Sequence, residues 1–362
     1  MQSIAIGEDV GALDAAIEKL PNRPAIFVLR PREGIPHLAK TKVLRRRLQR
    51  LLRIADLRRS LAGIDYCLTG SALESAFELH KVARGYFPAN YRETLRLRLP
   101  PYLKVVLGNP FPRTHVTTHL AGARASYYGP FRSRASAEQF ESELLDLFQV
   151  RRCQEDLLPS PLHPGCMYGE MGKCLRPCQD AVGLDEYAHE VARLVDFVSS
   201  DGRSLLGSLS AARERLSAEM QFEEAARQHR QMERVEAVLK LRDEISRNVE
   251  RLNAVAVTAS VESDAAELHC FRGGCYQGAE RVSFELVEGK PVSLDQKLRE
   301  TFSVWATPKS TEPREREEHL AILARWFYSS WCDGEMLLID DFDHVPYRKL
   351  VHAISRVCQP GR

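Results

Sequence analysis

Four cysteines fall within 26 residues of glycine- and proline-rich chain, and thiolates at such density are ligands for soft metals. Cys153, Cys166, Cys174 and Cys178 are separated by 12, 7 and 3 residues. Four sulfurs match the ligand count of structural zinc and of an iron–sulfur cluster. Zinc ribbons present closely spaced pairs, and only the last pair is close here. The spacing therefore favours iron–sulfur and leaves zinc as the alternative.

Other residues of the same segment fit a metal site. Gly165, Gly169 and Gly172 would let the backbone approach a cluster closely. Lys173 and Arg176 would offset its negative charge. Core cysteines do not normally gather in a loop without apolar neighbours, so an unrelated set of buried thiols is the weaker interpretation. The remaining cysteines lie singly beside apolar or strand residues and are expected in cores: Cys67, Cys270, Cys275, Cys332 and Cys358.

A basic segment is the second feature that could bind a ligand. Residues 40–59 contain nine lysines and arginines and a single acid, Asp56, although the whole chain carries a net charge of only +2. A locally basic face on a near-neutral chain is typical of a surface that contacts nucleic-acid phosphates. A solvated helix face is the alternative. We expect contacts to DNA from Lys40, Lys42, Arg45, Arg46 and Arg50.

Length and composition bound the class of protein. A chain of 362 residues with 44% hydrophobic residues can form two or three domains with sizeable cores. No apolar run is long enough to span a bilayer, and residues 1–20 lack the pattern of a signal peptide. We therefore expect a cytoplasmic protein without a membrane partner. In that reducing compartment the nine cysteines are ligands or core residues rather than disulfides.

Strands and helices alternate in the first part of the chain. Residues 23–30 have the composition of a buried strand between turn signals, and residues 35–39 are a candidate partner strand. Residues 42–57 show apolar positions at helical spacing, with arginines on the opposite face. Another strand at 64–69 and a helix capped by Ser71 complete a small α/β unit.

The later chain mixes helices and strands, so the predicted fold class is α+β with several domains. The cysteine segment itself shows no clear period and needs a cross-link to be ordered. Asp340, Asp341 and Asp343 are interpreted as a solvated turn after a strand. The expected strands are 102–107, 114–118, 255–260, 266–272, 280–287 and 336–339, and the expected helices are 135–148, 185–199, 205–247 and 315–330.

Several tripeptides to hexapeptides around the first cysteine carry a family resemblance. They read Pro101-Tyr102-Leu103-Lys104, Phe111-Pro112-Arg113, Tyr128-Gly129-Pro130-Phe131 and Phe148-Gln149-Val150-Arg151-Arg152-Cys153. With the four cysteines, their order and spacing resemble the UvrC family, the UvrC component of the bacterial nucleotide-excision-repair nuclease, over roughly residues 21–243. The resemblance implies a [4Fe-4S] cluster on the four cysteines and a DNA-repair role.

A second motif resembles the family's UVR motif, a helical hairpin that docks onto a matching hairpin of the partner helicase, UvrB. It reads Leu216-x5-Phe222-Glu223-Glu224-Ala225-Ala226-Arg227. The apolar stripe around it is too narrow to form a core alone, and a second amphipathic hairpin would bury it. Packing on the protein's own body is the alternative. The resemblance implies partner contacts from Phe222, Glu223, Ala225 and Ala226.

The N-terminal unit resembles the GIY-YIG nuclease domain but departs from it where the chemistry lies. The GIY strand reads Ala25-Ile26-Phe27, so its tyrosine is absent, and the YIG tripeptide reads His37-Leu38-Ala39. Lys40 follows as in the family, and Arg47 falls on the catalytic arginine. The position of the metal-binding glutamate holds Leu79.

These departures predict that the nuclease activity is lost. Phosphodiester cleavage needs a base, a divalent metal and a cation for the developing charge. Arg47 survives, and His37 could act as a base. Leu79 offers no ligand for Mg²⁺, and the adjacent Glu78 is turned by about 100° around the helix.

The interpretation is a truncated, degenerate UvrC paralogue that binds DNA and a UvrB-type helicase. Two alternatives stay open. One is an active endonuclease that makes one incision with Arg47, His37 and Glu78, and the other is a cluster-bearing scaffold that binds UvrB only. The predicted units are a degenerate GIY-YIG-like domain at 20–92, a cysteine-rich module with the iron–sulfur site at 93–200, a UVR hairpin at 201–247, and a C-terminal α/β module at 253–362 without an RNase H-like nuclease core.

Overall fold

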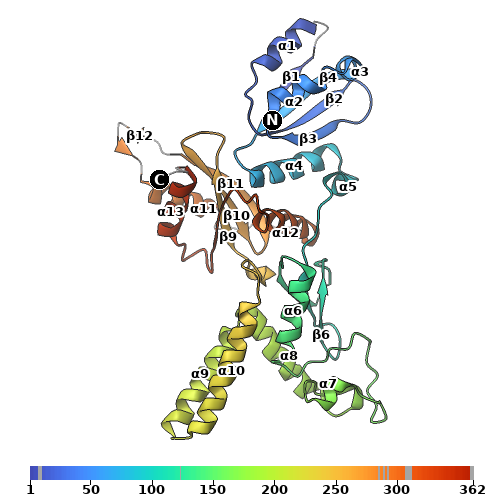
Figure 1. The fold of residues 1–362 in the computed structure, drawn as a ribbon, viewed down its shortest axis with the longest axis vertical. Helices are drawn as coiled ribbons and strands as arrows, with labels where there is room; N and C mark the ends of the chain where they lie inside the picture. The colour runs from blue at the N-terminus through green and yellow to red at the C-terminus, as the bar shows by residue number, and fades with distance from the viewer. Residues whose placement is uncertain are drawn as a thin grey trace.

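The computed structural model describes residues 1–6, 10–122, 124–283, 286–287, 290–291, 293–305 and 312–358. Figure 1 shows an N-terminal unit beside a C-terminal α/β unit, with the middle of the chain and a helical hairpin extending away from both. The α+β class is confirmed, because helices and several small antiparallel sheets share the chain. Among the described helices, none combines the length and apolar character that crossing a membrane requires.

The N-terminal unit is built on a four-stranded antiparallel sheet in the order β1-β4-β2-β3. Its two faces follow from the alternation along β2. Ala25, Phe27 and Leu29 face α1 and α2, whereas Ile26 and Val28 face α4. The elements are β1 Gln2–Ala5, α1 Val10–Glu18, β2 Ala25–Pro31, β3 His37–Thr41, α2 Leu44–Leu51, α3 Ala55–Ser60, β4 Leu61–Leu68, α4 Ala72–Tyr86 and α5 Tyr91–Leu95.

The three predicted strands and the capped helix of this unit are confirmed, but the single helix at 42–57 is wrong. Ile54 takes an extended backbone with φ −77° and ψ 107°, so the helix ends at Leu51 and a new one begins at Ala55. Ser71 caps α4 as expected, because its side chain accepts a hydrogen bond from the backbone N–H of Glu74.

The middle unit has a four-stranded antiparallel sheet in the order β6-β5-β7-β8, covered by α6 and α8. Aromatic rings fill its core, where Tyr128 and Phe140 stack with ring centroids 5.2 Å apart. The elements are β5 Tyr102–Val106, β6 Arg113–Thr117, β7 Ala125–Gly129, α6 Arg134–Leu144, α7 Met167–Glu170, a 3₁₀ turn η1 Pro177–Gln179, α8 Leu184–Ser199 and β8 Arg247–Asn248.

A helical hairpin leaves this unit between α8 and β8. It consists of α9 Arg203–Ala218 and α10 Phe222–Lys240, which pack against each other along their length. The two helices agree with the hairpin expected at 201–247, whereas the prediction of one continuous helical stretch over 205–247 is wrong. The chain reverses at residues 219–221, where Met220 adopts a left-handed backbone with φ 61°. After the hairpin, β8 pairs with β7 and adds the last strand to the sheet of the middle unit.

The C-terminal unit is an antiparallel sheet in the order β11-β10-β9-β14, with α11 and α13 on one face and α12 on the other. The predicted strand at 280–287 is wrong as a unit. β11 already begins at Cys275 and ends at Ser283, and residues 284–285 lie outside the described residues. The elements are η2 Val249–Arg251, β9 Ala254–Ala259, β10 Ala265–Arg272, β11 Cys275–Ser283, β12 Leu286–Val287, β13 Lys290–Pro291, α11 Leu294–Val304, α12 Pro313–Phe327, β14 Gly334–Leu338 and α13 Tyr347–Cys358.

The N- and C-terminal units pack directly against each other through α4 and α12. Leu73 and Phe77 of α4 share a core with Leu320, Leu323 and Trp326 of α12. The ring of Phe77 also stacks on Tyr276 of β11, with centroids 3.8 Å apart. The two units therefore form one continuous packed body, although their helices are far apart in the sequence.

The acids after β14 form a turn, as predicted. Asp341 and Asp343 are exposed, and a carboxylate oxygen of Asp341 accepts a hydrogen bond from the backbone N–H of Asp343 at 3.2 Å. Such a side chain–backbone bond stabilises turns without any ligand.

Candidate metal centre and nucleic-acid interface

A fully buried arginine organises the start of the cysteine segment. The Arg151 guanidinium donates hydrogen bonds to the carbonyl oxygens of Phe111 at 2.8 Å, Glu155 at 2.7 Å and Cys153 at 3.2 Å. Its backbone N–H donates to the Tyr187 hydroxyl at 3.1 Å. These contacts anchor an irregular loop to the core of the middle unit, because the loop has few backbone partners of its own.

Two of the cysteine sulfurs accept hydrogen bonds from N–H groups. The Arg151 guanidinium reaches Cys153 Sγ at 3.5 Å, and the backbone N–H of Arg176 reaches Cys174 Sγ at 3.4 Å. N–H donors toward sulfur stabilise negative charge on it, which is a property of thiolate ligands in iron–sulfur sites. Another nitrogen of the same guanidinium, Arg151 Nη2, is buried without a partner among the described residues.

The four cysteines lie within electrostatic range of one another. Burial raises the pKa of Cys174 to about 11, and Cys153, Cys166 and Cys178 each add to the rise. The pKa of Cys178 is also raised, chiefly by burial and then by Cys153 and Cys166. Within the described part of the chain, however, no three side chains of His, Cys, Asp or Glu stand close enough to hold a metal without adjustment.

Two of the three glycines of the segment meet close neighbours, Gly165 at Gln179 and Gly169 at Arg176, whereas a Cβ on Gly172 would meet nothing within 4 Å. Gly165 and Gly172 have left-handed backbones with φ 75° and 68°. A Cβ on Gly169 would lie 2.8 Å from the Arg176 side chain, so only glycine fits there. Of the two predicted counter-cations, Lys173 is engaged, because its Nζ lies 2.9 Å from an Asp146 oxygen.

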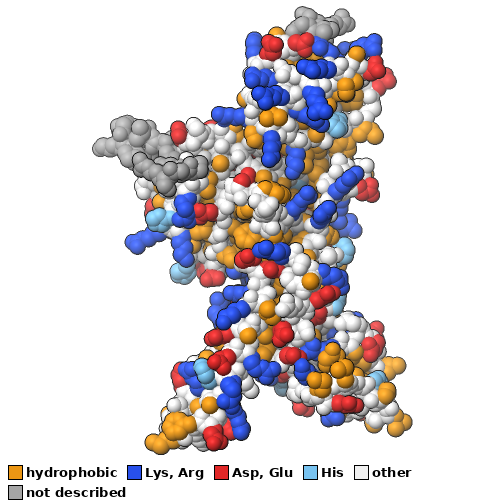
Figure 2. All heavy atoms as spheres, viewed as in Figure 1, with side chains coloured by type: hydrophobic (Ala, Val, Ile, Leu, Met, Phe, Trp, Pro, Cys, Tyr) orange, Lys and Arg blue, Asp and Glu red, His pale blue; other side chains and the backbone are white. Residues whose placement is uncertain are grey.

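The predicted DNA-binding cations divide between two places. Lys42, Arg46 and Arg50 are exposed on or beside α2, and Arg45 is half-buried with its guanidinium donating to the Glu18 carbonyl. Figure 2 shows lysine and arginine side chains gathered on the visible face of the N-terminal unit. Lys40 lies apart from them, on the face of the sheet that α4 covers, because its register partner in β2 is Ile26.

The same alternation separates the candidate nuclease residues. His37 pairs with Leu29 and its ring lies 6.5 Å from Phe27, so it belongs to the α2 face of the sheet. Leu79 lies on the other face, where it packs against Ile26 and Val28. Neither His37 nor Arg47 lines the cavity in which Leu79 meets Lys40.

Glu78 does not take the place of the missing carboxylate at position 79. It lines a different cavity, together with Tyr276, Glu315 and His319 of the C-terminal unit. Its nearest cation is Lys81, with Nζ 3.9 Å from the carboxylate. The side chains of Glu78 and Leu79 therefore point in different directions from α4, as the helical rotation predicts, and Leu79 faces Lys40.

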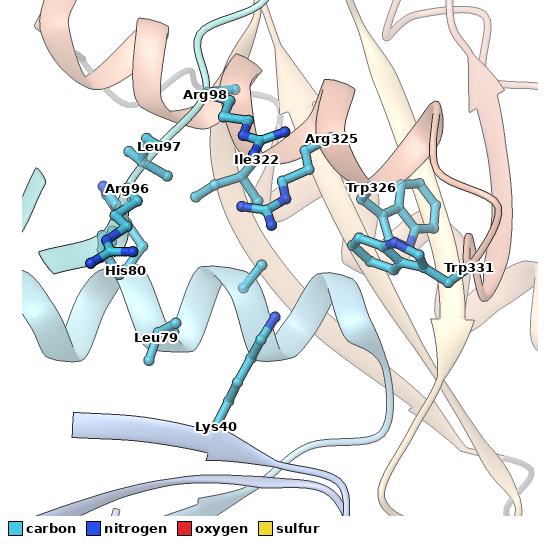
Figure 3. Close-up of a pocket in the computed structure, with 13 residues that line it drawn as sticks. Lys40, Leu79, His80, Arg96, Leu97, Arg98, Ile322, Arg325, Trp326 and Trp331 are labelled. Carbon is cyan, nitrogen blue, oxygen red and sulfur yellow. The ribbon is translucent and has the colours of Figure 1, made fainter. Parts of the chain in front are cut away.

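The cavity beside Leu79 has a volume of about 320 Å³ and lies between α4, α12 and the chain that follows α5. Figure 3 shows Lys40 from β3 and Arg325 from α12 extending toward one another across it. Arg96 and Arg98 line it too, and Trp326 and Trp331 lie at one side. Sequence reasoning missed this site, because Arg325 is far from Lys40 along the chain.

A buried carboxylate fastens the same junction. Glu318 of α12 is 1% exposed and accepts hydrogen bonds from His80 Nε2 at 2.7 Å, from the Tyr91 hydroxyl at 2.7 Å and from Arg92. Burial alone would raise the pKa of Glu318, but the hydrogen bonds from His80, Tyr91 and Arg92 lower it to about 2. No motif in the sequence pointed to this contact.

The hairpin is buried at its base and exposed at its tip. Leu209, Val235 and Val238 join the core of the middle unit, so the alternative that the stripe packs on the protein's own body holds for this half. At the tip, Phe222 is 65% and Met220 is 78% exposed. Figure 2 shows hydrophobic side chains at this free end. Ala225 is buried between the helices, whereas Glu223 and Ala226 are not.

A comparison with known protein families finds a match for the middle unit. Residues 100–197 match the family described as the UvrC/Cho excinuclease, middle domain, a span that runs from β5 into α8 and includes all four cysteines. This part of the chain is thus similar to the middle domain of that family.

Curated relatives give the particular protein that the chain resembles. It is 23% identical to the UvrABC system protein C of Lachnospira eligens over 76% of this chain and 47% of that protein. It is 25% identical to that of Moorella thermoacetica over 76% and 46%, and 23% identical to that of Acetivibrio thermocellus over 91% and 51%. The resemblance to UvrC is therefore confirmed, and the chain spans about half the length of these relatives. No solved structure matches it.

Proposed function

We propose that this protein acts in nucleotide excision repair as a UvrC-like protein that binds DNA and a UvrB-type helicase, without nuclease activity of its own. The observation that carries the proposal is the UvrC/Cho middle domain at residues 100–197, from which a helical hairpin with an exposed apolar tip projects. Partner binding, DNA binding, the lost incision and the metal can each be tested separately.

The hairpin tip is the proposed partner-binding surface. Phe222 is a large apolar side chain that the protein's own packing leaves in water, and its burial by a second hairpin would be favourable. Binding of purified UvrB should be lost in Phe222→Asp. Leu162→Asp is the matched control, because Leu162 is 93% exposed but lies in the cysteine segment. Equal UvrB binding by both variants would refute the docking assignment.

The loss of nuclease activity is supported by the residues around Leu79. A divalent metal prefers oxygen ligands, and the side chains that line the cavity at this position are apolar or basic. We expect no incision of a lesion-bearing labelled duplex in the presence of Mg²⁺ or Mn²⁺ and UvrB. Incision that Arg47→Ala abolishes would instead favour the active endonuclease.

The proposed DNA contacts lie on α2 and before it. Neutralising exposed arginines there should weaken duplex binding and flatten its salt dependence, because each phosphate contact releases counterions. We expect Arg46→Gln/Arg50→Gln to reduce the slope by about 2, one per lost contact. An unchanged slope would favour the scaffold that binds UvrB only.

The four cysteines are proposed to hold a [4Fe-4S] cluster, with zinc as the alternative. The type and number of donors support the proposal, since four thiols lie in one segment, two accept N–H hydrogen bonds, and a buried guanidinium nitrogen beside them has no partner among the described residues. The cluster would cross-link an irregular loop. Anaerobically purified protein should contain iron and absorb in the visible region, and Cys174→Ser should lose both. Stoichiometric zinc without iron would show that the metal is wrong.

A further inference from the structure

The cavity beside Leu79 concentrates positive charge. Lys40, Arg96, Arg98 and Arg325 line it, and among the described residues no aspartate or glutamate does. In the part of the chain that the structure describes, none of these four side chains forms an ion pair. Other arginines at this junction are paired, as Arg84 is with Glu315 and Arg92 with Glu318. Cations without acidic partners are thus gathered in one hollow.

Lys40 and Arg325 carry like charges and extend toward one another across the cavity, so they repel one another. The pKa of Lys40 is lowered, first by burial and then by the nearby charge of Arg325. An anion in the cavity would remove the repulsion between the cations, and the chemistry of the lining selects a phosphate over a metal.

Apolar side chains line the cavity among the cations, and one exposed aromatic ring lies at its side. Leu79, Leu97 and Ile322 are apolar, and Trp331 is 47% exposed at the side of the cavity. Trp326 is less available, because it is 1% exposed and its Nε1 donates to Asp333 at 2.8 Å. Stacking on an exposed tryptophan is how proteins hold an unpaired nucleobase regardless of its identity.

We propose that this cavity binds one nucleotide without a metal ion, its phosphate held by Lys40, Arg98 and Arg325 and its base against Trp331. A volume of about 320 Å³ is at the small end of ligand pockets, which suits a mononucleotide unit rather than duplex DNA. The source is either an unpaired nucleotide of a DNA strand or a free nucleotide. The first source rests on the proposed DNA-binding function.

The test uses the full chain in EDTA with three probes, which are a short 5′-phosphorylated oligothymidylate, its unphosphorylated form, and thymidine 5′-monophosphate. Binding is followed by tryptophan fluorescence and by competition. Lys40→Met/Arg325→Met should bind the phosphorylated probe about 100-fold more weakly, at about tenfold for each lost charge-assisted contact. The matched control is Lys81→Met, since Lys81 is 79% exposed and outside this cavity.

Two further variants test the walls. Trp331→Ala should weaken both phosphorylated probes about tenfold. Leu79→Glu should also weaken them, because its carboxylate would pair with the cations. Tighter binding of the strands than of the mononucleotide identifies an unpaired nucleotide of a DNA strand as the source, at its 5′ end if the phosphorylated strand is preferred, and tighter binding of the mononucleotide identifies a free nucleotide.

The proposal is overturned if neither phosphorylated probe binds, or if both bind equally to the wild type and to Lys40→Met/Arg325→Met. Duplex binding by Arg46→Gln/Arg50→Gln is measured in parallel. If the α2 variant loses duplex binding but keeps nucleotide binding, α2 contacts duplex DNA and the cavity does not. If the wild type binds nucleotide but never binds duplex, the proposed DNA-binding function is wrong and the cavity assignment still holds.

Discussion

The cysteine segment and the cation-lined cavity differ in how their residues are brought together. The four cysteines lie within 26 residues, and Arg151 anchors the chain around the first of them to the core of the middle unit. The cavity joins Lys40 to Arg325 across the packing of α4 on α12. The first site therefore depends on one buried loop anchor, and the second depends on an interface between two units.

The loop anchor predicts the largest loss of stability. Arg151→Met should destabilise the protein by about 4 kcal/mol, because one buried and two part-buried carbonyl contacts and the charge of the buried guanidinium that makes them would be lost. Urea unfolding measures the change. Arg134→Gln is the control, since Arg134 is 67% exposed and its pairing with Glu138 should contribute under about 0.5 kcal/mol. A loss no greater than that of the control would mean that the segment does not need its anchor.

Removing the Glu318 carboxylate should destabilise the interface between α4 and α12. Glu318→Ala leaves His80, Tyr91 and Arg92 without their shared acceptor, and we expect a loss of about 3 kcal/mol. Hydrogen exchange should rise in α4 and α12 but not in the middle unit. The control is Glu262→Ala, because Glu262 is 60% exposed and its ion pair with Arg281 should matter little. Uniform exchange changes over the whole chain would contradict an interface effect.

Acid should act on the same carboxylate. The folded-state pKa of Glu318, about 2, lies below the usual 4.5. The charged carboxylate therefore stabilises the fold fully above pH 4.5, and this stabilisation is lost as the pH falls from 4.5 toward 2. By pH 3 about 2 kcal/mol should be gone, at about 1.4 kcal/mol per pH unit below 4.5. Urea unfolding of the wild type and Glu318→Gln from pH 6 to 3 should therefore converge. A constant difference between them would refute the assigned pKa.

The contrast between local and distant contacts also explains what the sequence could predict. The clustering of the four cysteines and the apolar stripe of the hairpin are local patterns, and position 79 could be placed by helical rotation from Glu78. The sharing of Glu318 by His80, Tyr91 and Arg92, and the meeting of Lys40 with Arg325, depend on how two units pack. No periodicity within either segment encodes that contact. The break at Ile54 escaped because it interrupts a pattern that continues on either side, whereas the reversal near Met220 follows from the hairpin resemblance and not from periodicity.

The smallest effect is expected at the hairpin tip, where function and stability should separate. Phe222 is 65% exposed, so Phe222→Asp should change the free energy of unfolding by less than about 0.5 kcal/mol while UvrB binding is lost. Val235 at the hairpin base is 1% exposed, and Val235→Asp should destabilise by several kcal/mol, about 3 or more, because a charge would be buried in the core of the middle unit. Urea unfolding of the two variants makes the comparison. A large destabilisation by Phe222→Asp would mean that the tip packs within the protein, and its loss of UvrB binding would then reflect unfolding rather than a docking surface.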